Sequence, residues 1–89
     1  SGVITMAKKI IWGEETCPGC KLAKNYLADE IRSGEFEFIS VDSDEGQKID
    51  EMFDFKEIPQ CLVRKDGGGY EKCDLEHEIE ESLKRKGRK

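Results

Sequence analysis

The sequence has no long hydrophobic run, and its 89 residues include only two prolines, one tryptophan and one histidine. A membrane-spanning helix needs about 20 consecutive apolar residues, so we expect no membrane segment and no membrane partner. The N-terminus lacks the basic stretch followed by an apolar run that marks a signal peptide, which predicts a cytoplasmic location. The length fits one domain over residues 1–89, with residues 1–6 interpreted as a flexible N-terminus or a remnant of cloning.

Charge is abundant but uneven. Charged residues make up 39% of the chain and the net charge is −5. Residues 1–83 hold all twenty acidic residues and ten of the fifteen basic ones, whereas residues 84–89 form a basic tail with a charge of +5. An acidic body is repelled by phosphate, so no nucleic-acid partner is expected. The tail is interpreted as a solvated terminus whose cations complement the end of the last helix.

Hydrophobic periodicity predicts strands over residues 8–12, 35–41, 60–64 and 70–73. Between the first two strands, one helix from Pro18 to Ser33 is expected. Its buried face would consist of Leu22, Ala23, Tyr26, Leu27 and Ile31. A second helix follows the acidic turn 42–45, and its apolar, core-facing side would consist of Ile49, Met52 and Phe53. A third is capped by Asp74 and carries Leu75, Ile79 and Leu83. These elements predict an α/β fold with a four-stranded mixed sheet flanked by three helices.

Four cysteines without an export signal do not indicate a disulfide framework, and in a reducing compartment they are more often catalytic or metal-binding. Cys17-Pro18-Gly19-Cys20 stands where the first strand leads into the first helix, with Pro18 at the first helical position. Unpaired backbone N–H groups at a helix start stabilise a thiolate, so we expect a lowered pKa for Cys17, helped by the charge of Lys21 and opposed by those of Glu14 and Glu15. Cys17 is therefore the predicted nucleophile and Cys20 the resolving thiol of a disulfide exchange.

The motif, its position and the Ile58-Pro59 pair before a later strand resemble the glutaredoxin-like members of the thioredoxin superfamily. The resemblance covers residues 8 to about 83 and implies the thioredoxin fold. It also implies a cis peptide bond at Pro59, a substrate-binding backbone at Ile58, and Asp74 as a partner for a ligand ammonium group. Trp12 is expected to pack beside the active-site turn, with substrate contact as the alternative.

Three departures from the glutaredoxin pattern concern glutathione. Glu14 stands where glutaredoxins usually have a lysine, Glu57 where they have a threonine, and Tyr70-Glu71 where they have a glycine pair. Two carboxylates near the entrance would repel the glutathione anion, which favours disulfide-containing protein clients. The electron donor is then either glutathione or a flavin-dependent reductase.

The alternative class is a non-enzymatic binding module, either a thioredoxin-like adaptor or a domain stabilised by zinc. Further zinc ligands would be Cys61, Cys73 and His77, but 52 residues separate Cys20 from Cys73, against about 12–20 between usual ligand pairs. Cys61 is interpreted as a small buried side chain, Cys73 as either a regulatory thiol or a plain residue at the helix start, and His77 as exposed. The favoured prediction is a monomeric dithiol–disulfide oxidoreductase with no tightly bound cofactor and no metal.

Overall fold

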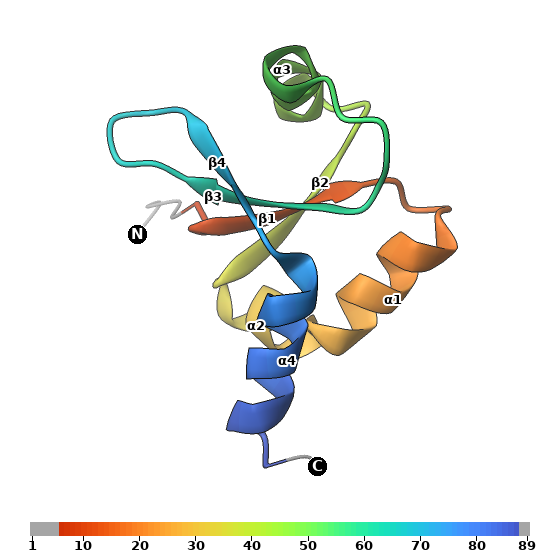
Figure 1. Cartoon of the computed structure of the whole chain (residues 1–89), viewed down its shortest axis with the longest axis vertical. Helices are drawn as coiled ribbons and strands as arrows, with labels where there is room; N and C mark the ends of the chain where they lie inside the picture. Colours follow the sequence, from red (N-terminus) through yellow and green to blue (C-terminus); the bar gives the residue numbers. More distant parts are fainter. Residues whose placement is uncertain (1–5, 88–89) are drawn as a thin grey trace, which may run out of the picture.

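Four strands and four helices are arranged around one mixed sheet in the computed structural model, which describes residues 6–87 (Figure 1). The strands are β1 (Lys9–Gly13), β2 (Phe36–Ser40), β3 (Gln60–Arg64) and β4 (Tyr70–Cys73). The helices are α1 (Pro18–Tyr26), α2 (Ala28–Ser33), α3 (Asp44–Phe53) and α4 (Leu75–Arg85). The α/β class and the four-stranded mixed sheet are confirmed. Most of the predicted N-terminal extension (1–5) and the end of the basic tail (88–89) lie outside the described residues.

The strand order across the sheet is β2-β1-β3-β4. β1 pairs in parallel with β2 and antiparallel with β3, and β3 pairs antiparallel with β4. A parallel pair needs a long crossover, which α1 and α2 supply, whereas a short turn joins β3 to β4. Because β1 is central and covered on both faces, Ile10, Ile11 and Trp12 are all buried.

Helices cover both faces of the sheet: α3 lies on one side, and α1, α2 and α4 lie on the other (Figure 1). Alternate residues of β1 point to opposite faces and so enter different cores. The core under α3 contains Ile10, Trp12, Ile39, Ile49 and Leu62. The opposite core contains Ile11, Ala23, Leu27, Phe36 and Cys61. Met52, expected in the core, is exposed on α3, so that prediction is wrong.

The single helix expected between β1 and β2 is instead two helices that meet at Leu27. The expected buried face is also wrong in part, since Leu22 is 57% exposed and Tyr26 is 47% exposed. Ala23 and Leu27 are buried as expected, and Cys20 is buried with them. Each of the two exposed residues directly precedes a buried one, and one residue of helix turns a side chain by about 100°. Burying Cys20 against the sheet therefore rotates Leu22 and Tyr26 outward.

A buried carboxylate on α2 binds the end of α4. Glu30 is 6% exposed and accepts hydrogen bonds from Ser82 Oγ at 2.6 Å, Arg85 Nη2 at 3.0 Å and Lys86 Nζ at 3.2 Å. Burial opposes ionisation of Glu30, but these hydrogen bonds outweigh it and hold the pKa of Glu30 below its usual value. The basic tail was predicted to be solvated: Arg85 is indeed exposed although it pairs with Glu30, whereas the prediction is wrong for the half-buried Lys86, because the buried charge of Glu30 needs cationic partners.

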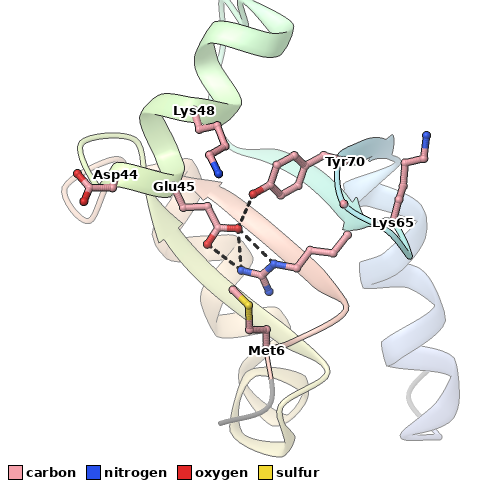
Figure 2. Close-up of a pocket in the computed structure, with 9 residues that line it drawn as sticks. Met6, Asp44, Glu45, Lys48, Lys65 and Tyr70 are labelled. Atoms are coloured by element: carbon pink, nitrogen blue, oxygen red, sulfur yellow. Dashed lines mark hydrogen bonds and ion pairs between the residues drawn. The ribbon is translucent and has the colours of Figure 1, made fainter.

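Arg64 on β3 fixes the start of α3 (Figure 2). Its Nη2 atom lies 2.9 Å from each carboxylate oxygen of Glu45, and its Nη1 atom lies 3.0 Å from Oε1 of Glu37. The Tyr70 hydroxyl points toward Glu45 and donates a hydrogen bond of 2.7 Å to Oε2. Burial and this hydrogen bond raise the pKa of Tyr70 to about 12, so it remains a donor at neutral pH. None of the helices in residues 6–87 has the length and apolar character needed to cross a membrane.

Candidate redox site

The two cysteines of the Cys-Pro-Gly-Cys motif lie at the junction of β1 and α1. Cys17 is the N-cap of α1 with extended backbone angles, and Pro18 is the first helical residue, as predicted. The Cys17 carbonyl accepts the N–H of Lys21 at 3.0 Å, which closes the first helical turn around the motif. Cys17 is half-buried, Cys20 is fully buried, and both are free thiols. The outer sulfur is thus the accessible one, as a nucleophile must be.

Hydrogen bonds stabilise the thiolate form of Cys17. The backbone N–H of Cys20 and then the Cys20 thiol lower the pKa of Cys17 below its usual value, and the N–H of Gly19 contributes further. Burial and the negative charge of Glu14 act in the opposite direction. The net lowering agrees with the expectation from the helix start, and it increases the fraction of reactive thiolate at neutral pH.

Cys20 has the opposite environment. Burial raises the pKa of the Cys20 thiol, and the neighbouring Cys17 sulfur raises it further, against a hydrogen bond from the Glu14 backbone. A Cβ atom added to Gly13 would collide with Sγ of Cys20, so β1 leaves room for this sulfur only because residue 13 is glycine. Cys17 therefore ionises more readily than Cys20, which is the order that the predicted roles of nucleophile and resolving thiol require.

The Ile58–Pro59 peptide bond is cis, as the resemblance implied. The Pro59 ring lies beside the motif: a Cβ atom placed on Gly19 would be 3.4 Å from Pro59 Cδ and 3.9 Å from Cys17 Sγ. Ile58 is half-buried and packs against the core under α3. The structure thus brings Cys17, Cys20 and Pro59 together from two distant parts of the chain. The substrate-binding roles of Ile58 and Pro59 stay predictions.

Trp12 is buried in the core on the α3 side of the sheet, and its expected packing beside the cysteine motif stays a prediction. It is 4% exposed, its indole N–H donates to the Gly46 carbonyl at 2.9 Å, and its ring centroid lies 5.1 Å from that of Phe55. Trp12 also lines an open groove of about 470 Å³ next to the motif, together with Glu14 and Ile58 among others. Both interpretations of Trp12 therefore remain compatible with its position.

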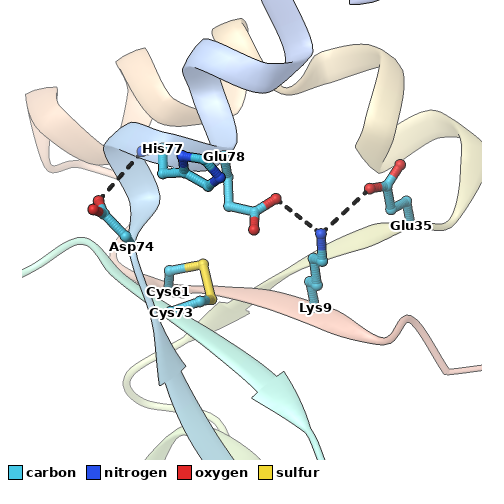
Figure 3. Close-up of a disulfide and its surroundings, with 7 residues drawn as sticks. All are labelled: Lys9, Glu35, Cys61, Cys73, Asp74, His77 and Glu78. Carbon is cyan, nitrogen blue, oxygen red and sulfur yellow. Dashed lines mark hydrogen bonds and ion pairs between the residues drawn. A yellow bond between two sulfur atoms is a disulfide. The ribbon is translucent and has the colours of Figure 1, made fainter.

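Asp74 is the N-cap of α4 and accepts the backbone N–H of His77 at 3.3 Å (Figure 3). The capping prediction is confirmed. Asp74 does not line the groove beside the cysteine motif, and its carboxylate is already used by the helix. Its proposed contact with a ligand ammonium group stays a prediction.

Cys61 and Cys73 form a disulfide bond that the sequence interpretation missed (Figure 3). The expectation that the four cysteines do not form a disulfide framework is wrong for this pair. Cys61 is buried, as interpreted, but it is bonded to Cys73, which is therefore not a plain residue at the helix start. The two residues are directly opposite in the β3–β4 register, and their Cα atoms are 4.9 Å apart. The signal was available, because pairing Arg64 with Tyr70 across the predicted turn brings residues 61 and 73 opposite one another.

The described residues do not fit the zinc alternative. Cys61 and Cys73 are bonded to each other, so neither supplies a thiolate ligand. Within residues 6–87, no group of three or more His, Cys, Asp or Glu side chains is placed to hold a metal ion. A structural zinc site takes four such ligands. Cys17 and Cys20 thus lack the partners that a zinc site would need.

Replacing Glu14 with glutamine is expected to lower the pKa of Cys17 further, because the glutamate charge is one of the influences that raise it. The measurement is the rate of Cys17 alkylation by iodoacetamide across pH, which follows the thiolate fraction. Glu15→Gln is the matched control, since Glu15 is not among the groups that shift the pKa of Cys17 and its carboxylate lies 2.7 Å from Lys24 Nζ. An unchanged or raised midpoint in Glu14→Gln would contradict this account of the site.

Comparison with known proteins gives one structural likeness. No family model and no curated protein matches the sequence. Among solved structures, the chain is similar to the solution structure of a thioredoxin from Thermus thermophilus, with 20% sequence identity and a TM-score of 0.49. The similarity covers 85% of this chain and 70% of the thioredoxin.

Proposed function

We propose that this protein is a thiol–disulfide oxidoreductase that reduces disulfide bonds in other proteins through Cys17 and Cys20. The observation that supports this most is the opposite shift of the two thiols: the pKa of the accessible Cys17 is lowered and that of the buried Cys20 is raised. Pairs of titratable groups whose pKa values are shifted in opposite directions are typical of active sites. The adjacent cis-Pro59 agrees with the glutaredoxin-like resemblance.

The proposed reaction has two exchange steps. The Cys17 thiolate attacks one sulfur of the client disulfide, forms a bond to it, and releases the other client sulfur as a thiolate. The Cys20 thiol then loses its proton to solvent and attacks Sγ of Cys17. This step forms the Cys17–Cys20 disulfide and releases the second client thiolate. Two electrons pass to the client. Its two thiolates, which have the pKa of an ordinary thiol, then take up protons from solvent.

The next cycle requires a reductant that returns two electrons to Cys17 and Cys20. Glu14 and Glu57 line the same groove beside the motif. Glutathione is anionic at neutral pH and would be repelled there, so the proposed donor is a protein dithiol supplied by a flavin-dependent reductase. The cytoplasmic location stays a prediction.

The test is a single turnover of the fully reduced catalytic pair with a peptide that contains one intramolecular disulfide. We expect the peptide to be reduced in equal amount to the protein, with a new bond between Cys17 and Cys20 located by mass spectrometry of digested protein. A binding module would leave the peptide oxidised, and that result would contradict the proposal. Reduced glutathione and a thioredoxin reductase, added separately, would then show which one regenerates the thiols.

A further inference from the structure

A groove of about 470 Å³ adjoins the reactive cysteine on the side of α3. Its apolar wall contains Trp12, Phe55 and Ile58, and the Trp12 and Phe55 rings pack at 5.1 Å. The motif residues do not line the groove themselves, but two lining residues connect the groove to the motif. Glu14 accepts the Cys17 N–H through its carbonyl at 3.3 Å, and Ile58 is bonded to the Pro59 ring beside the motif. A client segment next to the disulfide that Cys17 attacks would therefore lie in or across this groove.

The polar lining of the groove is strongly acidic. Glu14, Asp42, Asp50 and Glu57 line it, and none of their carboxylates forms an ion pair with any of residues 6–87. Lys56 is the cation in this lining, and its Nζ is 3.3 Å from Asp54 Oδ2. The groove therefore presents several uncompensated negative charges to whatever binds beside Cys17.

The aromatic wall is also suited to cations. The ammonium group of Lys72 already lies 5.6 Å from the centroid of the Phe55 ring, so this ring binds a positive charge within the protein itself. Lysine and arginine side chains can cover apolar surface with their methylene groups while their charged ends reach carboxylates. A wall of aromatic and aliphatic side chains with a rim of carboxylates offers both contacts at once.

We infer that the clients of this protein carry lysine or arginine residues beside the disulfide that is reduced, and that this groove binds the basic segment. The inference rests on the proposed function and specifies its substrate class. The two exchange steps and their electron balance are unchanged. The groove adds attraction that steers the client disulfide toward Cys17, an effect that raises association rates about 10- to 1,000-fold in other charged clefts.

The probes are disulfide-containing peptides of identical core sequence, flanked by a short run of lysines, of glutamines or of glutamates. For each peptide, the second-order rate constant for oxidation of the reduced protein is measured in a single turnover, and rates are expressed relative to the glutamine peptide. We expect the lysine peptide to react about 10-fold faster or more, and the glutamate peptide more slowly. This spread should collapse in about 1 M salt, where the Debye length is about 3 Å.

The groove variant is Asp42→Asn/Asp50→Asn/Glu57→Gln, which leaves Glu14 and therefore the pKa of Cys17 intact. Its matched control is Asp66→Asn/Glu71→Gln/Glu80→Gln, which removes the same charge from exposed residues outside the groove. We expect the lysine preference to be lost in the groove variant and kept in the control. Equal rates for the three peptides, or a preference that survives in the groove variant or falls equally in the control, would overturn the inference. Failure of wild type to reduce any of the peptides would instead overturn the proposed function.

Discussion

Replacing Cys17 with serine is expected to abolish disulfide reduction, with a loss of at least about 10³-fold. A serine hydroxyl is barely ionised at neutral pH, and the hydrogen bonds that lower the pKa of Cys17 cannot make it a comparable nucleophile. The measurement is the rate of peptide-disulfide reduction in the presence of excess dithiol, compared with the same assay without protein. Cys17 is half-buried at the start of α1, outside both cores, so the variant should remain folded.

Cys20→Ser provides the contrasting result. Its Cys17 thiolate can still attack a client, but no second thiol releases the product, so the mixed disulfide between Cys17 and the client should accumulate. It would be seen as a protein–peptide adduct that disappears on addition of strong reductant. Equal and partial losses of activity in the two variants, without a trapped adduct, would contradict the roles assigned to these thiols.

Loss of the Cys61–Cys73 disulfide is expected to have the largest effect on stability. The bond closes a loop with a sequence separation of 12 residues, and a cross-link of that size contributes about 3 kcal/mol to the free energy of unfolding. Cys73→Ser should therefore lower the melting temperature by roughly 10–25 °C for a domain of this size. The cross-link also ties β4, an edge strand, to β3 directly before α4 begins.

The measurement is thermal unfolding in the absence of oxygen and of free reductant, after Cys17 and Cys20 have been reduced selectively, and free thiols are titrated in the same samples. Cys17→Ser is the matched control, since it removes a thiol outside the disulfide and should leave the melting temperature nearly unchanged. Native wild type should show the two free thiols of Cys17 and Cys20. Four free thiols in wild type, or equal melting temperatures for wild type and Cys73→Ser, would show that the cross-link does not form.

Local sequence signals were sufficient for the strands and for the start of α1, whereas the catalytic roles of Cys17 and Cys20 stay predictions. Proline at the first helical position and alternating residues in β2 act over a few residues, and both predictions are confirmed. The side of α1 that faces the sheet was not predictable from local sequence. Leu22 and Tyr26 have the composition of a buried face, but the packing of Cys20 against Gly13 decides which side of the helix meets the sheet.

Two further features depended on contacts between distant residues. The ion pairs of Glu30 with Arg85 and Lys86 join residues more than fifty positions apart, so charge counting along the chain could not show that Glu30 binds both cations and half-buries Lys86. The Cys61–Cys73 bond was missed for another reason. In a reducing compartment cysteines are expected to stay unbonded, but the register of β3 and β4 places Cys61 and Cys73 directly opposite each other.

The position of Trp12 gives the protein a built-in optical reporter. It is the single tryptophan of the chain, it is held by a hydrogen bond to Gly46, and it lies at the wall of the groove near the Cys17–Cys20 motif. Indole emission responds to local polarity and to nearby quenchers, so occupation of the groove would change the fluorescence of the native protein without any attached dye. Binding and electron transfer could then be followed separately in one unlabelled sample.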